Sequence, residues 1–322
     1  MSHDVVVVLH YSGVEDTVRC VQSLAGERSS ARILVVDNGS GDSIRERIEE
    51  TCPGRTEHVR LTSNTGFTGG MNAGLAWAFE RHARTITVLN NDTVVSPGAI
   101  DALCAVAAAG HVLVSPEVRY LDDPSSVWFG GAVLDRELAL PRHLGEDEIA
   151  DRFGDRSPRE VELISGCCVT ATASVWQQLG GFDPLYFLMF EDSDLSVRAA
   201  ENGVRLLVLP EVTILHAVSA SFVGPMHALG LYYYSRNGLH FLRTAVPGSL
   251  ELRLRFVRRH VLPLLGRPRS QALAPWVRRS VFVATALADA SLHRGGRAPR
   301  WLERFAGHRA TPSEQSEPGK NG

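Results

Sequence analysis

Three aspartates stand at points where apolar stretches of the sequence give way to polar ones. Asp37 follows the apolar residues 33–36, Asp92 follows the apolar residues 85–89, and Asp192 opens a helical pattern. Ligands of open α/β sheets bind outside the carboxyl ends of the strands, so carboxylates at strand ends are candidates for ligand contacts. Each of the three has a chemical role open to it and a purely structural alternative.

Asp37 heads the sequence Asp-Asn-Gly-Ser. A carboxylate at this point can accept hydrogen bonds from a nucleobase N–H or a ribose hydroxyl. The same four residues also favour a turn that needs no ligand. Both interpretations stay open on this motif alone.

Residues 64–74 contain four glycines around the start of a helix expected over residues 71–79. Glycines let a ligand approach the backbone closely, and N–H groups at a helix N-terminus attract phosphate. The segment follows the third expected strand, whereas a dinucleotide fingerprint follows the first, and it lacks the Gly-Lys-Ser/Thr of a P-loop. Asn64 and Asn72 add amides that can hold a sugar phosphate, and a structural glycine turn is the alternative.

Asp92 closes the sequence Leu-Asn-Asn-Asp-Thr at the end of an apolar strand. A divalent cation held by one or two carboxylates, with phosphate oxygens completing its shell, neutralises a departing diphosphate, and Asp92 is the candidate ligand. Capping of the helix expected over residues 97–108 is the structural alternative. His216 follows the apolar residues 212–215 and becomes a candidate because Asp92 needs a second protein ligand.

Asp192 belongs to the acidic sequence Glu-Asp-Ser-Asp, at the start of a helix expected over residues 192–202. One of these carboxylates can take a proton from an attacking hydroxyl as a general base. The alternative is structural, since acidic side chains at a helix N-terminus are favoured by the macrodipole.

The elements that must position these residues alternate between strand and helix in the first half of the chain. Strand patterns cover residues 5–9, 33–36, 59–61 and 85–89, and helical patterns cover residues 14–24, 43–50, 71–79 and 97–108. Repeated βαβ units predict an α/β fold with a doubly wound, mostly parallel sheet. Further on we expect strands over residues 127–134, 161–172, 204–209 and 212–215, a polar loop over residues 136–159, and helices after residue 225.

The composition is that of a globular protein, with 322 residues, 44% of them hydrophobic, and a formal net charge of −3. Five scattered cysteines form no CxxC pair, which argues against a disulfide framework and for small buried side chains in a reducing compartment. We expect no signal peptide, because the first residues lead directly into a strand. No apolar stretch reaches the roughly 18 residues of a membrane span.

Residues 251–310 carry thirteen arginines against three acidic residues, Glu251, Asp289 and Glu303. Such a block can contact phosphates, anionic lipid or nucleic acid, and a merely solvated helical surface is the alternative. We expect a domain over residues 1–245, an arginine-rich helical extension over residues 246–310 and a disordered tail over residues 311–322.

Taken together, these segments resemble glycosyltransferase family 2, in particular its bacterial rhamnosyltransferase-like branch. The resemblance covers roughly residues 5–244 and includes His-Tyr-Ser at residues 10–12, the motifs above, residues 180–198, and Tyr-Tyr-Tyr-Ser-Arg-Asn at residues 232–237. It implies a GT-A fold and an inverting sugar transfer from a nucleoside diphosphate-sugar, with Mg²⁺ or Mn²⁺ as cofactor.

The resemblance also implies residue roles by position. Asp192 would be the general base, Asp92 the metal-binding aspartate of a DxD-type motif, and His216 would complete the metal site. Asp37 would contact the nucleobase. The other implied contacts with the nucleotide-sugar are those of Tyr11, Asn38, Asn64, Gly69, Asn72, Asn91 and Arg236. Asn90 replaces the first acid of the DxD motif, which leaves a single carboxylate for the metal.

The expected protein is therefore a cytoplasmic hexosyltransferase of cell-envelope or secondary-metabolite glycan biosynthesis. It would use a UDP- or dTDP-linked sugar and an acceptor hydroxyl, of a lipid-linked or phosphorylated acceptor, and no nucleic acid. The arginine-rich helices offer a peripheral contact with the inner face of the membrane.

Two alternatives to this function remain. One is a nucleotide-sugar-binding scaffold without catalysis, against which the presence of both Asp92 and Asp192 argues. The other is a sugar-1-phosphate nucleotidyltransferase, which would need a basic glycine-rich loop after the first strand. This chain has His-Tyr-Ser-Gly at that point.

Overall fold

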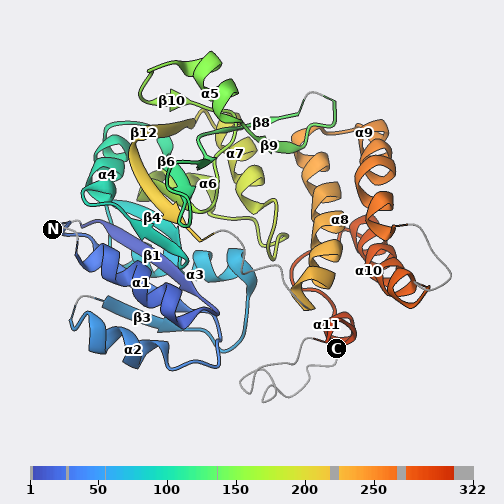
Figure 1. Ribbon diagram of the computed structural model, residues 1–322, viewed down its shortest axis with the longest axis horizontal. Helices are drawn as coiled ribbons and strands as arrows, with labels where there is room; N and C mark the ends of the chain where they lie inside the picture. Colours follow the sequence, from blue (N-terminus) through green and yellow to red (C-terminus); the bar gives the residue numbers. More distant parts are fainter. Residues whose placement is uncertain are drawn as a thin grey trace.

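A mixed β-sheet and a group of helices beside it make up the protein (Figure 1). The structure is a computed structural model that describes residues 3–26, 29–54, 56–135, 137–217, 225–266 and 273–307. The predicted tail over residues 311–322 lies outside the described residues.

The first part of the chain alternates strands and helices, as the sequence predicts. The strands are β1 (Val5–His10), β2 (Arg32–Asp37), β3 (Thr56–Arg60) and β4 (Thr85–Asn90), and the helices are α1 (Val14–Ala25), α2 (Ile44–Thr51) and α3 (Gly66–Glu80). β1 lies between β2 and β4, β3 flanks β2, and all these pairings are parallel. Nearly every side chain of β1 and β2 is buried, which is why these strands form continuous apolar runs in the sequence.

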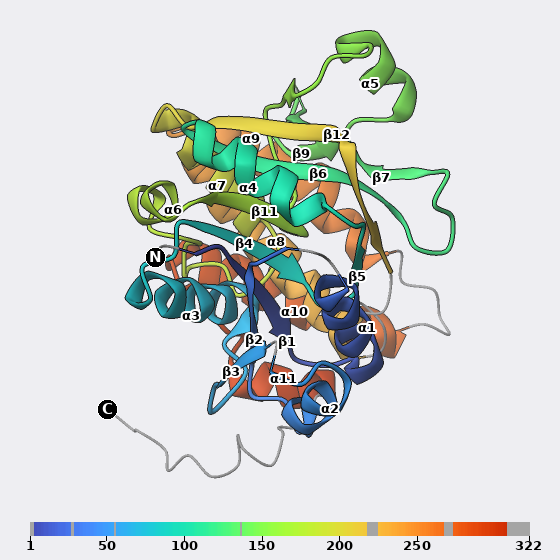
Figure 2. The ribbon, with the colours of Figure 1, turned by 90° about the vertical axis from the view of Figure 1, so that its left-hand side faces the viewer.

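The second part of the sheet contains a strand of the opposite direction. The order across the sheet is β10-β12-β6-β11-β4-β1-β2-β3. β11 (Cys168–Thr172) is antiparallel to both β4 and β6 (Val112–Tyr120), and β12 (Arg205–His216) is parallel to β6. Short strands complete the edges, with β5 (Thr93–Val95) on β12, β7 (Val127–Phe129) on β6, and β10 (Arg159–Glu160) on β12. The prediction of a mostly parallel α/β sheet is confirmed (Figure 2).

Several predicted boundaries are wrong, and the reasons are local. The expected strand over residues 161–172 is limited to β11, and the expected strand over residues 127–134 splits into β7 and β8 (Ala132–Leu134). The two strands expected over residues 204–215 are one strand, β12, whose register shifts between Leu209 and Thr213. The helix expected from residue 71 begins at Gly66. The four glycines expected before or at its start are therefore residues of α3 itself.

The region over residues 136–159 was expected to be a loop, and this expectation is corrected. It contains β9 (Pro141–His143), which pairs with β8, and the helix α5 (Glu146–Phe153). Ile149 of α5 is buried with Val133 and Leu144 in a small apolar cluster. Leu138 and Leu140 are buried in a second apolar cluster, so the segment is anchored although its composition is mainly polar.

The C-terminal helices stand beside the sheet, next to α7 (Glu191–Glu201), as Figure 1 shows. They are α8 (Pro225–Ala245), α9 (Leu250–Phe256), α10 (Leu273–Ser291) and α11 (Arg300–Ala306). Two other helices, α4 (Ala99–Ala109) and α6 (Ala173–Leu179), pack on the sheet itself. α8 and α10 share apolar clusters that are separate from the core of the sheet. The predicted domain boundary at residue 245 stays a prediction, although α8 packs mainly on the helices that follow it.

All five cysteines are buried and free, as the sequence predicts for small core side chains. No helix within the described ranges is long and apolar enough to cross a membrane.

Gly74 of α3 provides a test of how closely this helix lies on β1. A Cβ at position 74 would lie 2.2 Å from Val7 Cγ1. We expect Gly74→Ala to destabilise the protein by about 1–3 kcal/mol through overpacking, measured by chemical denaturation.

The matched control is Gly41→Ala, because no atom lies within 4 Å of a Cβ at that position. It should change the free energy of unfolding by less than about 0.5 kcal/mol. Equal destabilisation by the two substitutions would contradict the close packing of α3 on β1.

Candidate active site

The candidate site lies at one edge of the sheet, where several strands end. The parallel registers of β1 with β2 and β4 pair His10 with Asp37 and Leu9 with Asn90. β12 runs in the same direction as β4, since it is parallel to β6 and antiparallel β11 lies between β6 and β4. His216 at the end of β12 therefore comes to the same edge of the sheet as Asp37 and Asn90.

β11 brings to this edge residues 166 and 167, for which the sequence predicted no role in the site. Because β11 runs opposite to β4, it begins where β4 ends. The backbone N–H of Asn90 donates to the Cys167 carbonyl at 2.9 Å. The N–H of Gly166 donates to Asp192 Oδ2 at 3.0 Å. Residues 166 and 167 therefore connect the segment of Asp92 with the start of α7.

Asp92 and His216 form a close pair. Thr93 of β5 lies opposite His216 of β12, and the Ala217 N–H donates to the Asp92 carbonyl at 2.9 Å. As a result, His216 Nε2 lies 3.0 Å from Asp92 Oδ1. Trp128 of β7 packs edge-on against the imidazole, with ring centroids 4.7 Å apart. The fold thus brings together the two residues that were predicted as metal ligands.

This pair fits a divalent cation whose remaining ligands come from outside the protein. Adjacent ligands of an octahedral Mg²⁺ with bonds of about 2.1 Å lie about 3 Å apart, which is the separation of the Asp92 and His216 atoms. Asp92 Oδ1 is buried and, apart from the facing imidazole, has no hydrogen-bonding partner among the described residues. Within those residues no group of three His, Cys, Asp or Glu side chains could hold a metal ion. A cation here would need phosphate or water oxygens to complete its shell.

Asp192 lies in the first turn of α7, as predicted. Its Oδ2 accepts the Gly166 N–H, and its Oδ1 accepts the Ser193 N–H at 2.7 Å and the Ser193 hydroxyl at 3.2 Å. The side chain is half-buried. The hydrogen bonds fix its orientation, and the exposed part can accept a proton from a hydroxyl placed against it.

The two neighbouring acids differ from Asp192 in their surroundings. Asp194 is buried, and it accepts hydrogen bonds from Arg198 Nε at 2.7 Å and from the Tyr186 hydroxyl at 3.3 Å. Glu191 is also buried, and its Oε2 has no hydrogen-bonding partner among the described residues. Burial, and then the charges of Asp192 and Asp194, raise the pKa of Glu191 to about 8. Of the three acids, Asp192 alone combines a fixed orientation with exposure.

The turn that leads into α7 has an unusual backbone. Met189 and Phe190 have φ angles of 68° and 72°, in the left-handed region that costs an ordinary side chain of order 1 kcal/mol. The amide of Asn237, in α8, donates to the carbonyls of Leu188 at 2.8 Å and Met189 at 3.2 Å. The C-terminal helices therefore hold the turn that presents Asp192.

Asp37 is buried and forms the turn that was its structural alternative. Its Oδ1 accepts the Ser40 N–H at 2.8 Å, and its Oδ2 lies 3.4 Å from Arg60 Nε. The turn is confirmed, and the contact with a nucleobase stays a prediction.

Asn38 and Asn64 hold the segment where α3 begins. The Asn38 amide donates to the Gly66 carbonyl at 2.9 Å and to Asn64 Oδ1 at 3.2 Å, and its oxygen accepts the Thr65 N–H at 2.9 Å. Asn64 Oδ1 also accepts the Gly66 N–H at 2.8 Å. In this arrangement the Asn38 amide is used to shape the loop.

Gly69 and Asn64 line a small pocket at the start of α3, with a volume of about 260 Å³. Tyr186 and Phe187 also line it, together with Arg297 from the segment before α11. The Arg297 guanidinium donates to the Asn64 carbonyl at 3.2 Å. A contact of Gly69 with a nucleotide-sugar stays a prediction.

Asn72 and Asn91 also bind other parts of the chain. The Asn72 amide donates to the Phe182 carbonyl at 2.7 Å and accepts the Phe182 N–H at 3.0 Å. The Asn91 amide donates to the Ser12 carbonyl at 2.9 Å, next to the half-buried Tyr11. Both amides brace loops at the edge of the site, and direct contacts of Asn72, Asn91 and Tyr11 with a donor stay predictions.

The surroundings of Arg236 do not support its predicted contact with the donor. Its side chain is fully buried, and it donates to the Tyr232 hydroxyl at 2.9 Å, the Gly296 carbonyl at 2.7 Å and Asn237 Oδ1 at 2.9 Å. Each guanidinium nitrogen already binds an oxygen of the protein, which argues against a contact with a diphosphate. The sequence predicted a helix around Arg236. Only the packing of α8 in the structure shows that the side chain points into the protein.

Gly166, Cys167 and Asn237 are the positioning residues that sequence reasoning missed. A glycine inside a strand pattern signals a close backbone approach, so Gly166 carried a usable signal. A Cβ at position 166 would lie 3.3 Å from Asp192 Cβ. Nothing local marked Cys167, which acts through its carbonyl, and Asn237 stood in the motif beside Arg236.

The fold and this site define an α/β transferase of GT-A type. Residues 5–230 match the family model described as "Glycosyltransferase like family 2", and the chain belongs to this family of glycosyltransferases. It is 29% identical over 223 residues, 60% of this chain and 68% of the relative, to the N-acetylglucosaminyl-diphospho-decaprenol L-rhamnosyltransferase of Mycobacterium tuberculosis.

Two further similarities agree with this family. The chain is 21% identical over 229 residues, 69% of this chain and 74% of the relative, to the dTDP-rhamnosyl transferase RfbF of Shigella flexneri. The crystal structure of GalNAc-T7 with UDP, GalNAc and Mn²⁺ aligns with a TM-score of 0.57 at 14% identity, over 83% of this chain and 58% of that one. At this identity the structural likeness concerns the fold.

Glu191 generates a prediction about stability and pH. Its folded-state pKa of about 8 lies above the ordinary value of 4.5, so the folded protein keeps a proton that the unfolded chain loses. The resulting stabilisation is complete below pH 4.5 and is lost as the pH rises through about 8. We expect the Tm of Glu191→Gln to fall less between pH 5 and pH 9 than that of the wild type, measured by thermal unfolding across this range.

Glu201→Gln, an exposed position at the end of α7, is the matched control and should follow the wild type. Parallel curves for the wild type and Glu191→Gln would contradict the neutral state of Glu191 near pH 7.

Proposed function

We propose that the protein is an inverting glycosyltransferase that moves a sugar from a UDP- or dTDP-linked donor to an acceptor hydroxyl. The observation that carries this proposal is the arrangement around residues 166 and 167. These residues bind the Asp192 carboxylate on one side and the strand that ends at Asn90 on the other. One edge of the sheet thereby holds a candidate base and the Asp92–His216 pair.

In this mechanism, Asp192 takes the proton of the acceptor hydroxyl as its oxygen attacks the anomeric carbon. The attack comes from the face opposite the nucleoside diphosphate, which leaves with the electrons of the glycosidic bond, so the configuration inverts. The hydrogen bonds from Gly166 and Ser193 keep the carboxylate oriented for this transfer. Burial raises the pKa of Glu191 to about 8, which favours its neutral form beside Asp192 near pH 7.

Asp92 and His216 would hold Mg²⁺ or Mn²⁺. A divalent ion there supplies positive charge that neutralises the diphosphate. The protein contributes the positions of the two ligands, because the pairing of β5 with β12 holds Asp92 and His216 next to each other.

The relatives narrow the proposed substrates. The names of two of them include a rhamnosyl group, one dTDP-linked and the other transferred to a diphospho-decaprenol acceptor. We therefore favour a dTDP-linked deoxysugar as donor and a lipid-linked acceptor, in the cytoplasm at the membrane surface. The family membership and the presence of Asp192 argue against a nucleotide-sugar-binding scaffold without catalysis.

Asp192→Asn tests the general base. The substitution keeps the size of the side chain but removes its capacity to take a proton, so we expect kcat to fall by about 10²–10⁴-fold. Donor affinity, measured by calorimetry with dTDP and UDP, should stay within about 3-fold, because the role of Asp192 lies on the acceptor side.

Asp147→Asn, on the exposed face of α5, is the matched control and should keep wild-type turnover. A folded Asp192→Asn protein with near-normal kcat would refute the assignment.

Asp92→Ala tests the metal site without any turnover. We expect Mn²⁺ binding in the presence of dTDP or UDP, followed by electron paramagnetic resonance, to weaken by at least about 10-fold. His216→Ala should weaken it as well, and Asp101→Asn, an exposed position in α4, should not. Unchanged Mn²⁺ affinity in Asp92→Ala would refute the proposed role of Asp92 as a metal ligand. The proposal that Asp192 is the general base would not depend on this result.

A further inference from the structure

Most of the exposed large apolar side chains in the described part of the chain lie between residues 250 and 305, on the C-terminal helices or the turns next to them. They are Leu250, Leu254, Leu262, Val277, Leu292, Trp301 and Phe305, and Tyr120 is the exception. This is also the part of the chain in which arginines far outnumber acids. Single exposed apolar residues need no explanation, but their concentration in one basic region does.

Three of the leucines lie on α9 and the helical turns after it, which cover Val257–Val261 and Leu262–Leu265. Leu250, Leu254 and Leu262 recur at four- and eight-residue intervals, with Arg258 between the last two. Their exposed fractions are 59%, 56% and 46%. We call these four residues the leucine line.

The leucine line is not needed to pack the helix against the protein. Phe256 and Val261 are the residues of this segment that are fully buried, and they belong to the apolar cluster shared with α8 and α10. The helix therefore has a core-facing side and, separate from it, an apolar side without a partner in the described structure.

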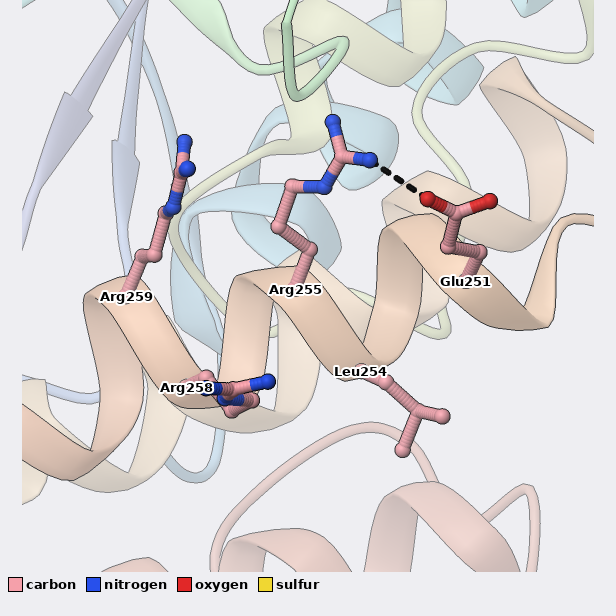
Figure 3. A pocket seen from close by; sticks show the side chains of 5 residues that line it. All are labelled: Glu251, Leu254, Arg255, Arg258 and Arg259. Carbon is pink, nitrogen blue, oxygen red and sulfur yellow. Dashed lines mark hydrogen bonds and ion pairs between the residues drawn. The ribbon is translucent and has the colours of Figure 1, made fainter.

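Figure 3 shows Leu254 and Arg258 at the lower side of the helix, whereas Arg255 and Arg259 extend from its upper side. Leu254, Arg255, Arg258, Arg259 and Glu251 line a hollow with a volume of about 520 Å³. Arg255 donates to Glu251, and Arg259 pairs with a glutamate before β9, Glu137. For Arg258, no ion-pair partner is present among the described residues.

We propose that the leucine line docks on an anionic phospholipid bilayer. Leu250, Leu254 and Leu262 would enter the boundary between headgroups and acyl chains, while Arg258 and its neighbours bind lipid phosphates. In this docking the protein lies on the surface of the bilayer and does not span it. It follows from this surface alone and goes beyond the transfer reaction.

Charge favours a bilayer over a second copy of this chain. A twofold contact through the leucine line would place the arginines of one copy against those of the other, since such an interface uses the same patch twice. An anionic bilayer instead presents negative charge to Arg258, which has no ion pair among the described residues, and an apolar layer to the three leucines.

Vesicle flotation of the purified full chain tests this docking. We compare vesicles of phosphatidylcholine alone with vesicles containing phosphatidylglycerol, without donor or acceptor. We expect binding to the anionic vesicles and little binding to the neutral ones. Arg258→Glu should lower the partition coefficient by about 10-fold or more, from the loss and reversal of one charge near the surface. The double variant Leu250→Gln with Leu254→Gln should lower it by a similar factor.

Arg45→Glu is the matched control, because Arg45 is exposed on α2, on the side of the molecule away from α9 in both views (Figures 1 and 2). It makes the same change of charge and should bind like the wild type. Unchanged circular dichroism and Tm establish that each variant folds.

Three results would overturn the proposal. They are no binding of the wild type to anionic vesicles, equal binding of Arg258→Glu and the wild type, and a wild-type dimer in light scattering that the leucine double variant converts to a monomer. Donor binding to Asp192→Asn is measured separately, so a failure here leaves the proposed function standing.

Discussion

The antiparallel insertion of β11 between β4 and β6 is the constraint on which the site depends. Because β11 runs against its neighbours, its first residues arrive at the edge where the parallel strands end. Two hydrogen bonds from backbone N–H groups follow, one from Asn90 to the Cys167 carbonyl and one from Gly166 to the Asp192 carboxylate. They connect the segment of Asp92 with the start of α7.

Burial separates the roles of three neighbouring acids. Glu191 is enclosed, so burial raises its pKa, and Asp194 is enclosed but paired with Arg198. Asp192 keeps contact with solvent while donors from Gly166 and Ser193 orient it. The same composition at a helix N-terminus thus yields a neutral acid, a structural ion pair and a candidate base.

The C-terminal helices connect the site with the surface of the molecule. Asn237 of α8 holds the left-handed turn before α7, while α9, packed on the same helices, exposes the leucine line. The C-terminal helices therefore hold the turn before the candidate base, and in the proposed docking they would also contact the bilayer. A lipid-linked acceptor would require both properties in one protein.

The sequence alone determined the fold class, the family and the identities of Asp92, Asp192 and His216 as candidates. Apolar periodicity and strand-end motifs are local signals, and parallel strands bring their ends to one edge. Only the tertiary structure decided that Arg236 is enclosed, that Asn38 and Asn72 brace loops, and that residues 136–159 contain a helix. It also decided that Gly166 binds Asp192, the candidate base, and that Asn237 holds the turn before it. The physical reason is that side-chain direction and burial depend on contacts between residues far apart in the chain, which no local pattern contains.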